Sequence, residues 1–309
     1  MKVVVAGGTG ALGTVLCDHL AERGHEVVVL TRRPMDDVHR QVQWDGRTVG
    51  GWAPELAGAA VVNLAGGPLG LRPTRDNVEA LRDSRVEPTR ALARAAAGLS
   101  DPVTVWLQAS TLALHGDGGD TEVDESTPAA AGPPQQAGVA RAWEAAAADA
   151  PAGRTVLLRT SVVLDRDTPA LDRLVDLVRR GLGGRIGSGE QWFSWIHVED
   201  WLAAVVWALR EDDVTGPVVL SSPGPVRNAE LMAALRRVLR RPAAPPTPAL
   251  LVRAGARLLD SDPALALTGR RAVPRRLLDA GFDFAHPELE EALRDLLGPR
   301  TRLGRPVEG

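Results

Sequence analysis

The stretch KVVVAGGTGALG, residues 2–13, decides the fold of this chain. It opens with a short run of β-branched residues and continues with glycines at G-x-x-G-x-x-G spacing over positions 7–13. Apolar residues at helical spacing follow over 11–23 and stop at Gly24. A strand, a glycine-rich turn and a helix in this order are typical of the unit that holds a dinucleotide by its pyrophosphate.

Each glycine of the loop has a physical role in that unit. Gly7 permits the tight turn, Gly10 lets the backbone approach a pyrophosphate, and Gly13 lets the helix pack closely on the strand. The N-terminus of the helix then offers unpaired N–H groups and a partial positive charge to the phosphates. The alternative is a structural turn without a ligand. We predict that the loop binds a dinucleotide through Gly7, Thr9, Gly10, Ala11, Leu12 and Gly13.

The end of the second predicted strand, residues 25–31, indicates which dinucleotide is bound. NAD sites usually end this strand with an acidic residue that binds the ribose 2′-hydroxyl. Here the strand ends with Thr31, Arg32 and Arg33. A guanidinium at this position attracts a 2′-phosphate and pairs with it through two hydrogen bonds. The sequence therefore predicts NADP(H), against the plainer interpretation of two solvated loop arginines.

Strand-like and helix-like segments alternate through the first half of the chain. A long helical pattern covers residues 76–97, and further apolar runs that resemble strands lie at 59–64, 103–109 and 154–163. This alternation favours a parallel sheet covered by helices on both faces. We therefore expect an α/β protein with a Rossmann-type doubly wound parallel sheet.

The regular alternation of strand-like and helix-like segments ends after about residue 164. A Gly-rich segment at 181–190 and a Pro-rich connection at 242–248 separate what reads mostly as short helices. We predict a nucleotide-binding Rossmann domain over 1–164 and a smaller, mostly helical substrate-binding lobe over 165–309. Part of that lobe, about 194–222, is expected to return to the Rossmann sheet.

Composition excludes several classes of protein and partner. The 309 residues carry a net charge of -3, which gives no electrostatic case for a nucleic-acid partner. No stretch of about 18 apolar residues predicts a membrane span, and the apolar run at the N-terminus is too short for a signal peptide. We expect a soluble, cytoplasmic protein without a membrane partner and without a metal site.

Motifs spread along the chain resemble a known group of proteins. The first loop, NLAG at 63–66 and the strand end at 109–111 resemble the short-chain dehydrogenase/reductase superfamily. The resemblance is closest to its atypical extended, epimerase-like subfamily, which carries a C-terminal domain of unknown function. The motifs that carry this second resemblance are WDG at 44–46, SRVEPTRAL at 84–92, LGGRIGSGEQWFSWIHVED at 182–200 and GFDF at 281–284.

The resemblance implies an NADP(H)-binding domain and a C-terminal lobe that closes a cleft. It implies that Thr31 and Arg32 meet the adenosine ribose phosphate and that Arg85 reaches toward the cofactor phosphates. Superfamily members often dimerise through two Rossmann helices, so a homodimer is one implied state. The positions that we assign to the cofactor outside the first loop are Thr31, Arg32, Leu64, Ala65, Gly66, Arg85, Ser110 and Val162.

The usual proton-transfer pair of the superfamily, a Tyr and a Lys four residues later, is absent. The chain has no Tyr, and its only Lys is Lys2. The counterparts of the pair fall near Gln136 and Ala140, and neither side chain can transfer a proton in that role. The superfamily's assisting Ser or Thr corresponds best to Thr111, with Ser110 beside it.

Three other features of the sequence are candidates for the chemistry. His115 titrates near neutral pH and is either a substitute acid or a loop histidine bonded to backbone. Glu144 is either an acid that faces the cleft or a solvated charge. The aromatic residues Trp192, Phe193 and Trp195 either line a pocket for an apolar or ring-containing small molecule or fill the interdomain core.

Two functions remain open at this point. The first is an NADP(H)-dependent oxidoreductase or epimerase-like enzyme that uses Thr111 and His115 as catalytic residues. The second is a non-catalytic NADP(H)-binding sensor, because an intact phosphate loop without the proton-transfer pair fits that function equally well. A strand-end Thr111 and an aromatic-flanked cleft favour the enzyme.

Overall fold

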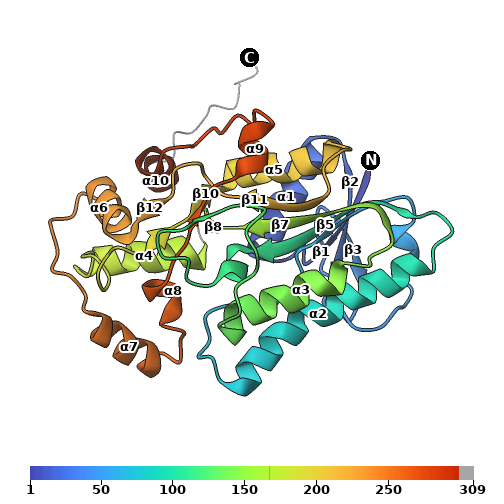
Figure 1. Ribbon diagram of the computed structural model, residues 1–309. Coiled ribbons are helices and arrows are strands. Elements are labelled where there is room, and N and C mark those ends of the chain that lie inside the picture. The colour runs from blue at the N-terminus through green and yellow to red at the C-terminus, as the bar shows by residue number, and fades with distance from the viewer. Residues whose placement is uncertain (167, 299–309) are drawn as a thin grey trace, which may run out of the picture.

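The computed structural model describes residues 1–166 and 168–298, so residues 167 and 299–309 of the predicted C-terminal lobe lie outside the described part. Its centre is a seven-stranded sheet with helices on both faces (Figure 1). The strand order is β11-β7-β5-β4-β1-β2-β3, and every neighbouring pair is parallel. The strands are β1 (Lys2–Ala6), β2 (Glu26–Thr31), β3 (Arg40–Gln43), β4 (Ala60–Asn63), β5 (Val103–Thr111), β7 (Ala152–Thr160) and β11 (Gly216–Leu220).

Alternation along β1 shows how the sequence builds two cores. Val3 and Val5 belong to the cluster on one face of the sheet, together with α1 (Ala11–Glu22) and α5 (Val198–Arg210). Val4 and Ala6 belong to the cluster on the other face. Successive side chains of a strand point to opposite faces, so a continuous apolar run is the pattern of a strand that is covered on both sides.

Two long helices cover the second face and pack on each other. They are α2 (Arg75–Ala97) and α3 (Val139–Ala147), which lie side by side below the sheet in Figure 1. Thr74 caps the N-terminus of α2, since its side chain accepts a hydrogen bond from Asn77 N. The doubly wound parallel architecture predicted from the alternating pattern is thereby confirmed.

Two details of the sheet differ from the expectation. The predicted strand over 154–163 is wrong as one element: it divides into β7 and β8 (Val162–Leu164). Between them, Ser161 N bonds to Leu220 O, and β8 leaves the sheet to pair with β10 (Trp195–His197). The sequence pattern also missed β3, whose residues RQVQ form a largely polar edge strand without apolar alternation.

The second part of the molecule is mostly helical. Its core lies between α4 (Pro169–Arg179), α6 (Asn228–Val238) and α10 (Leu289–Leu297), which Figure 1 shows on the side of the sheet away from β3. Short strand pairs tie it to the rest of the chain. The remaining elements are β6 (Glu122–Val123), β9 (Trp192–Phe193), β12 (Val226–Arg227), β13 (Arg271–Ala272), α7 (Ala249–Leu258), α8 (Ala264–Leu267) and α9 (Arg275–Asp279).

Helix α7 is peripheral to both cores. None of its residues is buried, and it stands apart from the sheet at the lower edge of Figure 1. None of the helices in the described part of the chain has the length and apolar character needed to cross a bilayer.

Candidate functional site

The predicted site residues gather at the carboxyl edge of the parallel sheet. Gly7 follows β1, Thr31 ends β2, Leu64 follows β4, Thr111 ends β5 and Val162 begins β8 just beyond β7. The register pairs Thr111 with Thr160, the last residue of β7. Ligands of doubly wound folds bind outside this edge, near the point where the strand order reverses, which here lies between β1 and β4.

The first loop is built from close backbone contacts. Gly7 has a φ of +83°, a conformation that side chains other than glycine rarely adopt. A Cβ atom on Gly13 would lie 2.2 Å from Gly7 O. Position 13 therefore admits only glycine while α1 starts this close to β1.

The N-terminus of α1 fits a phosphate group. Its N-cap residue, Gly10, has no side chain to bond the first amides of the helix. Thr9, Gly10 and Ala11 are exposed, and a Cβ atom on Gly10 would be tightly placed only against Gly7 O, at 3.3 Å. Free N–H groups at an open helix N-terminus are the donors that a pyrophosphate needs.

The end of β2 fits a further phosphate. Thr31 is buried, and its hydroxyl oxygen accepts a hydrogen bond of 3.4 Å from Arg33 N. Arg32 and Arg33 are exposed, and neither guanidinium has an ion-pair partner among the described residues. Two unpaired cations at the end of this strand, without an acidic residue, suit the 2′-phosphate of NADP(H).

A buried amide network fixes the loop after β4. Asn63 Nδ2 donates to Thr89 Oγ1 at 2.9 Å and to Gln108 Oε1 at 3.0 Å, and Asn63 Oδ1 accepts from Ala65 N. Gln108 Oε1 also accepts from Trp106 Nε1. The network thus joins the loop at Ala65 to β5 and α2. Sequence reasoning missed it, although amides in otherwise apolar strands were a signal, since buried polar groups need partners.

Arg85 lies against the same loop. It is buried, and it donates to Gly67 O at 3.0 Å and to Leu81 O at 3.1 Å. A Cβ atom on Gly66 would lie 3.1 Å from Arg85 Cζ. Burial lowers the pKa of Arg85 to about 10. No carboxylate in the described part of the chain pairs with this guanidinium, which is held by the carbonyls of Leu81 and Gly67.

A cluster of polar and charged side chains lies at the end of β5. Ser110 Oγ donates to Glu144 Oε1 at 2.6 Å, and Arg159 donates to both carboxylate oxygens of Glu144 at 3.0 and 3.1 Å. The side chains of Arg159 and Glu144 are only 11% and 13% exposed. The cluster ties α3 to β5 and β7. Glu144 is therefore a half-buried ion-pair partner, which corrects its interpretation as a solvated charge.

Thr111 is the N-cap and His115 the last residue of a short 3-10 turn, Leu112–His115, that follows β5. Thr111 Oγ1 accepts from Ala113 N at 3.2 Å, which leaves the hydroxyl proton free to donate. The ring of His115 is buried, and Nδ1 lies 3.2 Å from Pro128 O. A carbonyl only accepts, so Nδ1 carries the proton of the neutral ring and Nε2 keeps a lone pair.

Nε2 of His115 is buried without a hydrogen-bond partner. Burial also lowers the pKa of His115, so the neutral form prevails at neutral pH. The lone pair of Nε2 is therefore not engaged by any group in the described part of the chain.

The positions expected for the missing pair are occupied differently. Gln136 is buried in a π-helical turn, Pro134–Gly138, and Ala140 is buried in α3. Arg270 from the C-terminal part donates to Gly116 O at 2.9 Å and to Gln136 Oε1 at 3.4 Å. Burial lowers the pKa of Arg270. Sequence reasoning missed this residue, because its place depends on how the C-terminal part folds over the strand end.

The glycine-rich segment at 181–190 is a packed series of turns. A Cβ atom on Gly184 would lie 1.8 Å from Pro245 O, and Gly187 N bonds to Thr247 O. Of the aromatic residues that follow, Trp195 is fully buried and donates to Gly224 O, so it is core. Trp192 is half-buried, and its ring lies 4.0 Å from the guanidinium carbon of Arg227.

A histidine cluster lies at the start of α5. His197 caps the helix through Nδ1, which accepts from Glu199 N, and its ring stacks on His286 at 3.7 Å. His197, Glu199 and His286 offer three ligand atoms within 4.8 Å of one another. The cap, however, leaves the proton of the neutral His197 ring on Nε2, whereas a metal ligand needs its lone pair there. The arrangement therefore suits a neutral helix cap better than a metal site.

Comparisons with known proteins follow the same division of the chain. Residues 3–220 match the NAD dependent epimerase/dehydratase family, and residues 247–296 match a domain of unknown function, DUF1731. The epimerase family protein SDR39U1 of Bos taurus is 37% identical over 306 residues, covering 96% of this chain and all of that protein (100%). The epimerase family protein MT2273 of Mycobacterium tuberculosis is 36% identical over 296 residues, covering 94% of this chain and 96% of that protein.

A solved structure is similar over nearly its whole length. The human epimerase family protein SDR39U1 (isoform 2), crystallised with NADPH, has a TM-score of 0.84 and 32% sequence identity to this chain. The superposition covers 96% of this chain and 99% of the human protein. The likeness therefore extends over both parts of the molecule.

Proposed function

The chain belongs to the NAD dependent epimerase/dehydratase family, and we propose that it is an NADP(H)-dependent oxidoreductase of this family acting on a small carbonyl or alcohol substrate. The human relative was crystallised with NADPH, which supports the choice of cofactor. The exposed, unpaired Arg32 and Arg33 at the end of β2 support it independently, because they match the charge of a 2′-phosphate.

The residues of this chain that would hold the cofactor follow from the geometry of the sheet edge. The open N-terminus of α1 would bind the pyrophosphate, and Arg85 would add its buried positive charge. Ala65, whose amide is held by Asn63, would lie beside the adenosine ribose. Val162 would lie beside the nicotinamide. When bound, the nicotinamide supplies hydride transfer, and the protein orients the two reactants.

Proton handling falls to the turn after β5. The free hydroxyl proton of Thr111 donates a hydrogen bond to the substrate oxygen and holds it at the strand end. His115 Nε2, with its lone pair, takes up the hydroxyl proton of an alcohol that is oxidised or, once protonated, gives that proton to the oxygen of a carbonyl substrate that is reduced to an alcohol. The lowered pKa keeps this base neutral and ready at pH 7.

The observation that carries the proposal is the buried, unpartnered Nε2 of His115 on the turn that Thr111 starts. A non-catalytic NADP(H) sensor is the second candidate. It is favoured by Gln136, which stands near the expected place of the Tyr and is already bonded to Arg270.

The decisive experiment combines cofactor titration with turnover. NADPH, NADP, NADH and NAD are titrated by fluorescence, and NADPH oxidation is followed against aldehydes, ketones and sugar derivatives. Thr111→Val removes the hydroxyl and Thr111→Ser keeps it. We expect activity to fall about 100-fold in Thr111→Val and in His115→Phe, and to survive in Thr111→Ser. Tight NADPH binding with no turnover on any substrate would leave the sensor instead.

A further inference from the structure

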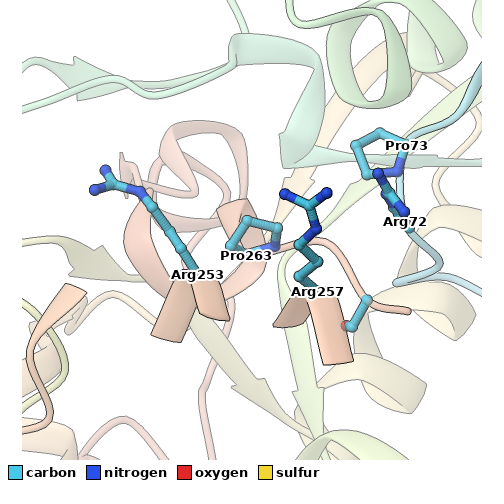
Figure 2. Close-up of a pocket in the computed structure, with 6 residues that line it drawn as sticks. Arg72, Pro73, Arg253, Arg257 and Pro263 are labelled. Carbon is cyan, nitrogen blue, oxygen red and sulfur yellow. The ribbon is translucent and has the colours of Figure 1, made fainter. Parts of the chain in front are cut away.

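A small cavity lies where the loop before α2 meets the α7 segment. Its volume is about 210 Å³, and three arginines dominate its lining. Figure 2 shows the guanidinium group of Arg257 standing between those of Arg253 and Arg72. The full lining is Arg72, Pro73, Arg253, Arg257, Ser261 and Pro263.

Three hydrogen bonds hold the two walls together. Arg72 N donates to Asp260 O at 2.9 Å, Asp262 N donates to Gly70 O at 3.0 Å, and Ser261 Oγ donates to Gly70 O at 2.9 Å. The last of these bonds joins residues 191 positions apart in the chain. The cavity is thus a built junction between the Rossmann part and the C-terminal part.

The three guanidinium groups have no partner in the described part of the chain. No carboxylate or carbonyl there bonds or pairs with the side chains of Arg72, Arg253 or Arg257. The buried carboxylate nearest in sequence, that of Asp262, is engaged by Ala264 N and Gln135 Nε2. Some other exposed arginines do pair with acids, as Arg237 does with Glu290.

Helix α7 carries an electrostatic cost in this arrangement. Arg253 and Arg257 are four residues apart on one helix face, a spacing at which like charges destabilise a helix. No residue of α7 is buried, so core packing does not impose the placement. An anion in the cavity would turn this repulsion into attraction.

We propose that this cavity binds a phosphate or diphosphate group of a small molecule. Planar guanidinium groups match phosphate oxygens through paired hydrogen bonds, and three of them carry enough positive charge to offset a dianion. Pockets for whole drug-sized ligands measure roughly 300–1,000 Å³, so a cavity of about 210 Å³ suits an anionic head group. That group belongs either to a free phosphate compound or to a substrate that reaches the sheet edge. Only the second source rests on the proposed function.

The first test measures binding of pyrophosphate to the full chain by calorimetry, at constant ionic strength set with chloride. We expect saturable binding that weakens at least about tenfold in Arg253→Gln/Arg257→Gln. Arg90→Gln removes an exposed, unpaired arginine of α2 outside the cavity and is the matched control. Equal binding by the double variant and the native chain, or no saturable binding by the native chain, would overturn the proposal. Circular dichroism establishes that the variants are folded.

The second arm separates the two sources. Glyceraldehyde 3-phosphate and glyceraldehyde are compared as a matched pair in NADPH oxidation. A preference for the phosphorylated compound that disappears in the double variant assigns the cavity to a substrate. Pyrophosphate binding without such a preference assigns it to a free phosphate compound. Because the first arm needs no turnover, failure of the proposed enzyme activity and failure of the anion site remain distinguishable.

Discussion

Ser110 Oγ donates a 2.6 Å hydrogen bond to Glu144, a residue 34 positions later in the chain, and the same carboxylate forms two hydrogen bonds with Arg159. The end of β5 is therefore tied to α3 and β7 by a half-buried ion pair.

Removing the Glu144 charge should destabilise the protein strongly. In Glu144→Gln, Arg159 stays half-buried beside a neutral amide, and the loss of charge-assisted hydrogen bonds costs about 1.5–3 kcal/mol. Urea unfolding measures this loss. Glu79→Gln, which breaks the exposed Arg75–Glu79 pair, should change the free energy of unfolding by less than about 0.5 kcal/mol. Similar losses in the two variants would contradict the structural role of the cluster.

Gly13→Ala should disrupt the first loop. The new Cβ atom would lie 2.2 Å from Gly7 O, so α1 must move away from β1. We expect a loss of about 3 kcal/mol in the free energy of unfolding, together with weaker NADPH binding. Gly255→Ala is the control, since a Cβ atom there meets nothing within 4 Å and should stabilise α7 by about 0.5–1 kcal/mol.

Arg32→Ala should change cofactor preference. Loss of charge-assisted hydrogen bonds to the 2′-phosphate weakens NADPH binding about 10- to 100-fold, whereas NADH binding stays the same. Fluorescence titration of both cofactors measures the ratio, with Arg90→Ala as the surface control. Equal weakening for NADPH and NADH would show that Arg32 does not contact the 2′-phosphate.

Stability should fall as the solution is acidified, in part through His197. Burial, reinforced by the neighbouring His286, lowers the pKa of His197 to about 4, below its ordinary value of 6.5. Between these values the unfolded chain binds a proton that the folded chain does not, so stability decreases as the pH falls from 6.5 to 4. At pH 5 the contribution is on the order of 2 kcal/mol.

His197→Asn isolates this effect, because asparagine still caps α5 but does not titrate. The variant should lose less stability than the native chain between pH 7 and pH 5. The groups that face His197 are His286, Glu199 and Asp295, and they are unchanged in the variant. Identical pH profiles would exclude a depressed pKa at His197.

The sequence was informative where local pattern decides structure. The β1–loop–α1 unit follows from apolar alternation, glycine spacing and helical periodicity, which all act within 23 residues. The resemblance drawn from the motifs was also confirmed by the matches over residues 3–220 and 247–296. Polar edge strands such as β3 escape this reasoning, because their pairing rather than their side chains makes them strands.

Contacts between side chains that are distant in the sequence could not be predicted from local sequence patterns. Glu144 pairs with Arg159 only because α3 lies over β5 and β7, and Arg270 reaches Gln136 only because β13 lies beside β6. Arg72 meets Arg257 only through the bonds between residues 70–72 and 260–262. Such contacts depend on long-range topology, which residue spacing does not encode.

The place of β11 has a consequence for how the chain is made. This strand completes the edge of the sheet beside β7, yet it follows β7 only after α4 and α5. During synthesis, the backbone groups on the outer edge of β7 stay unpaired until residues 216–220 have left the ribosome. A chain that stops before residue 216 should therefore aggregate through that edge instead of folding as a smaller nucleotide-binding protein.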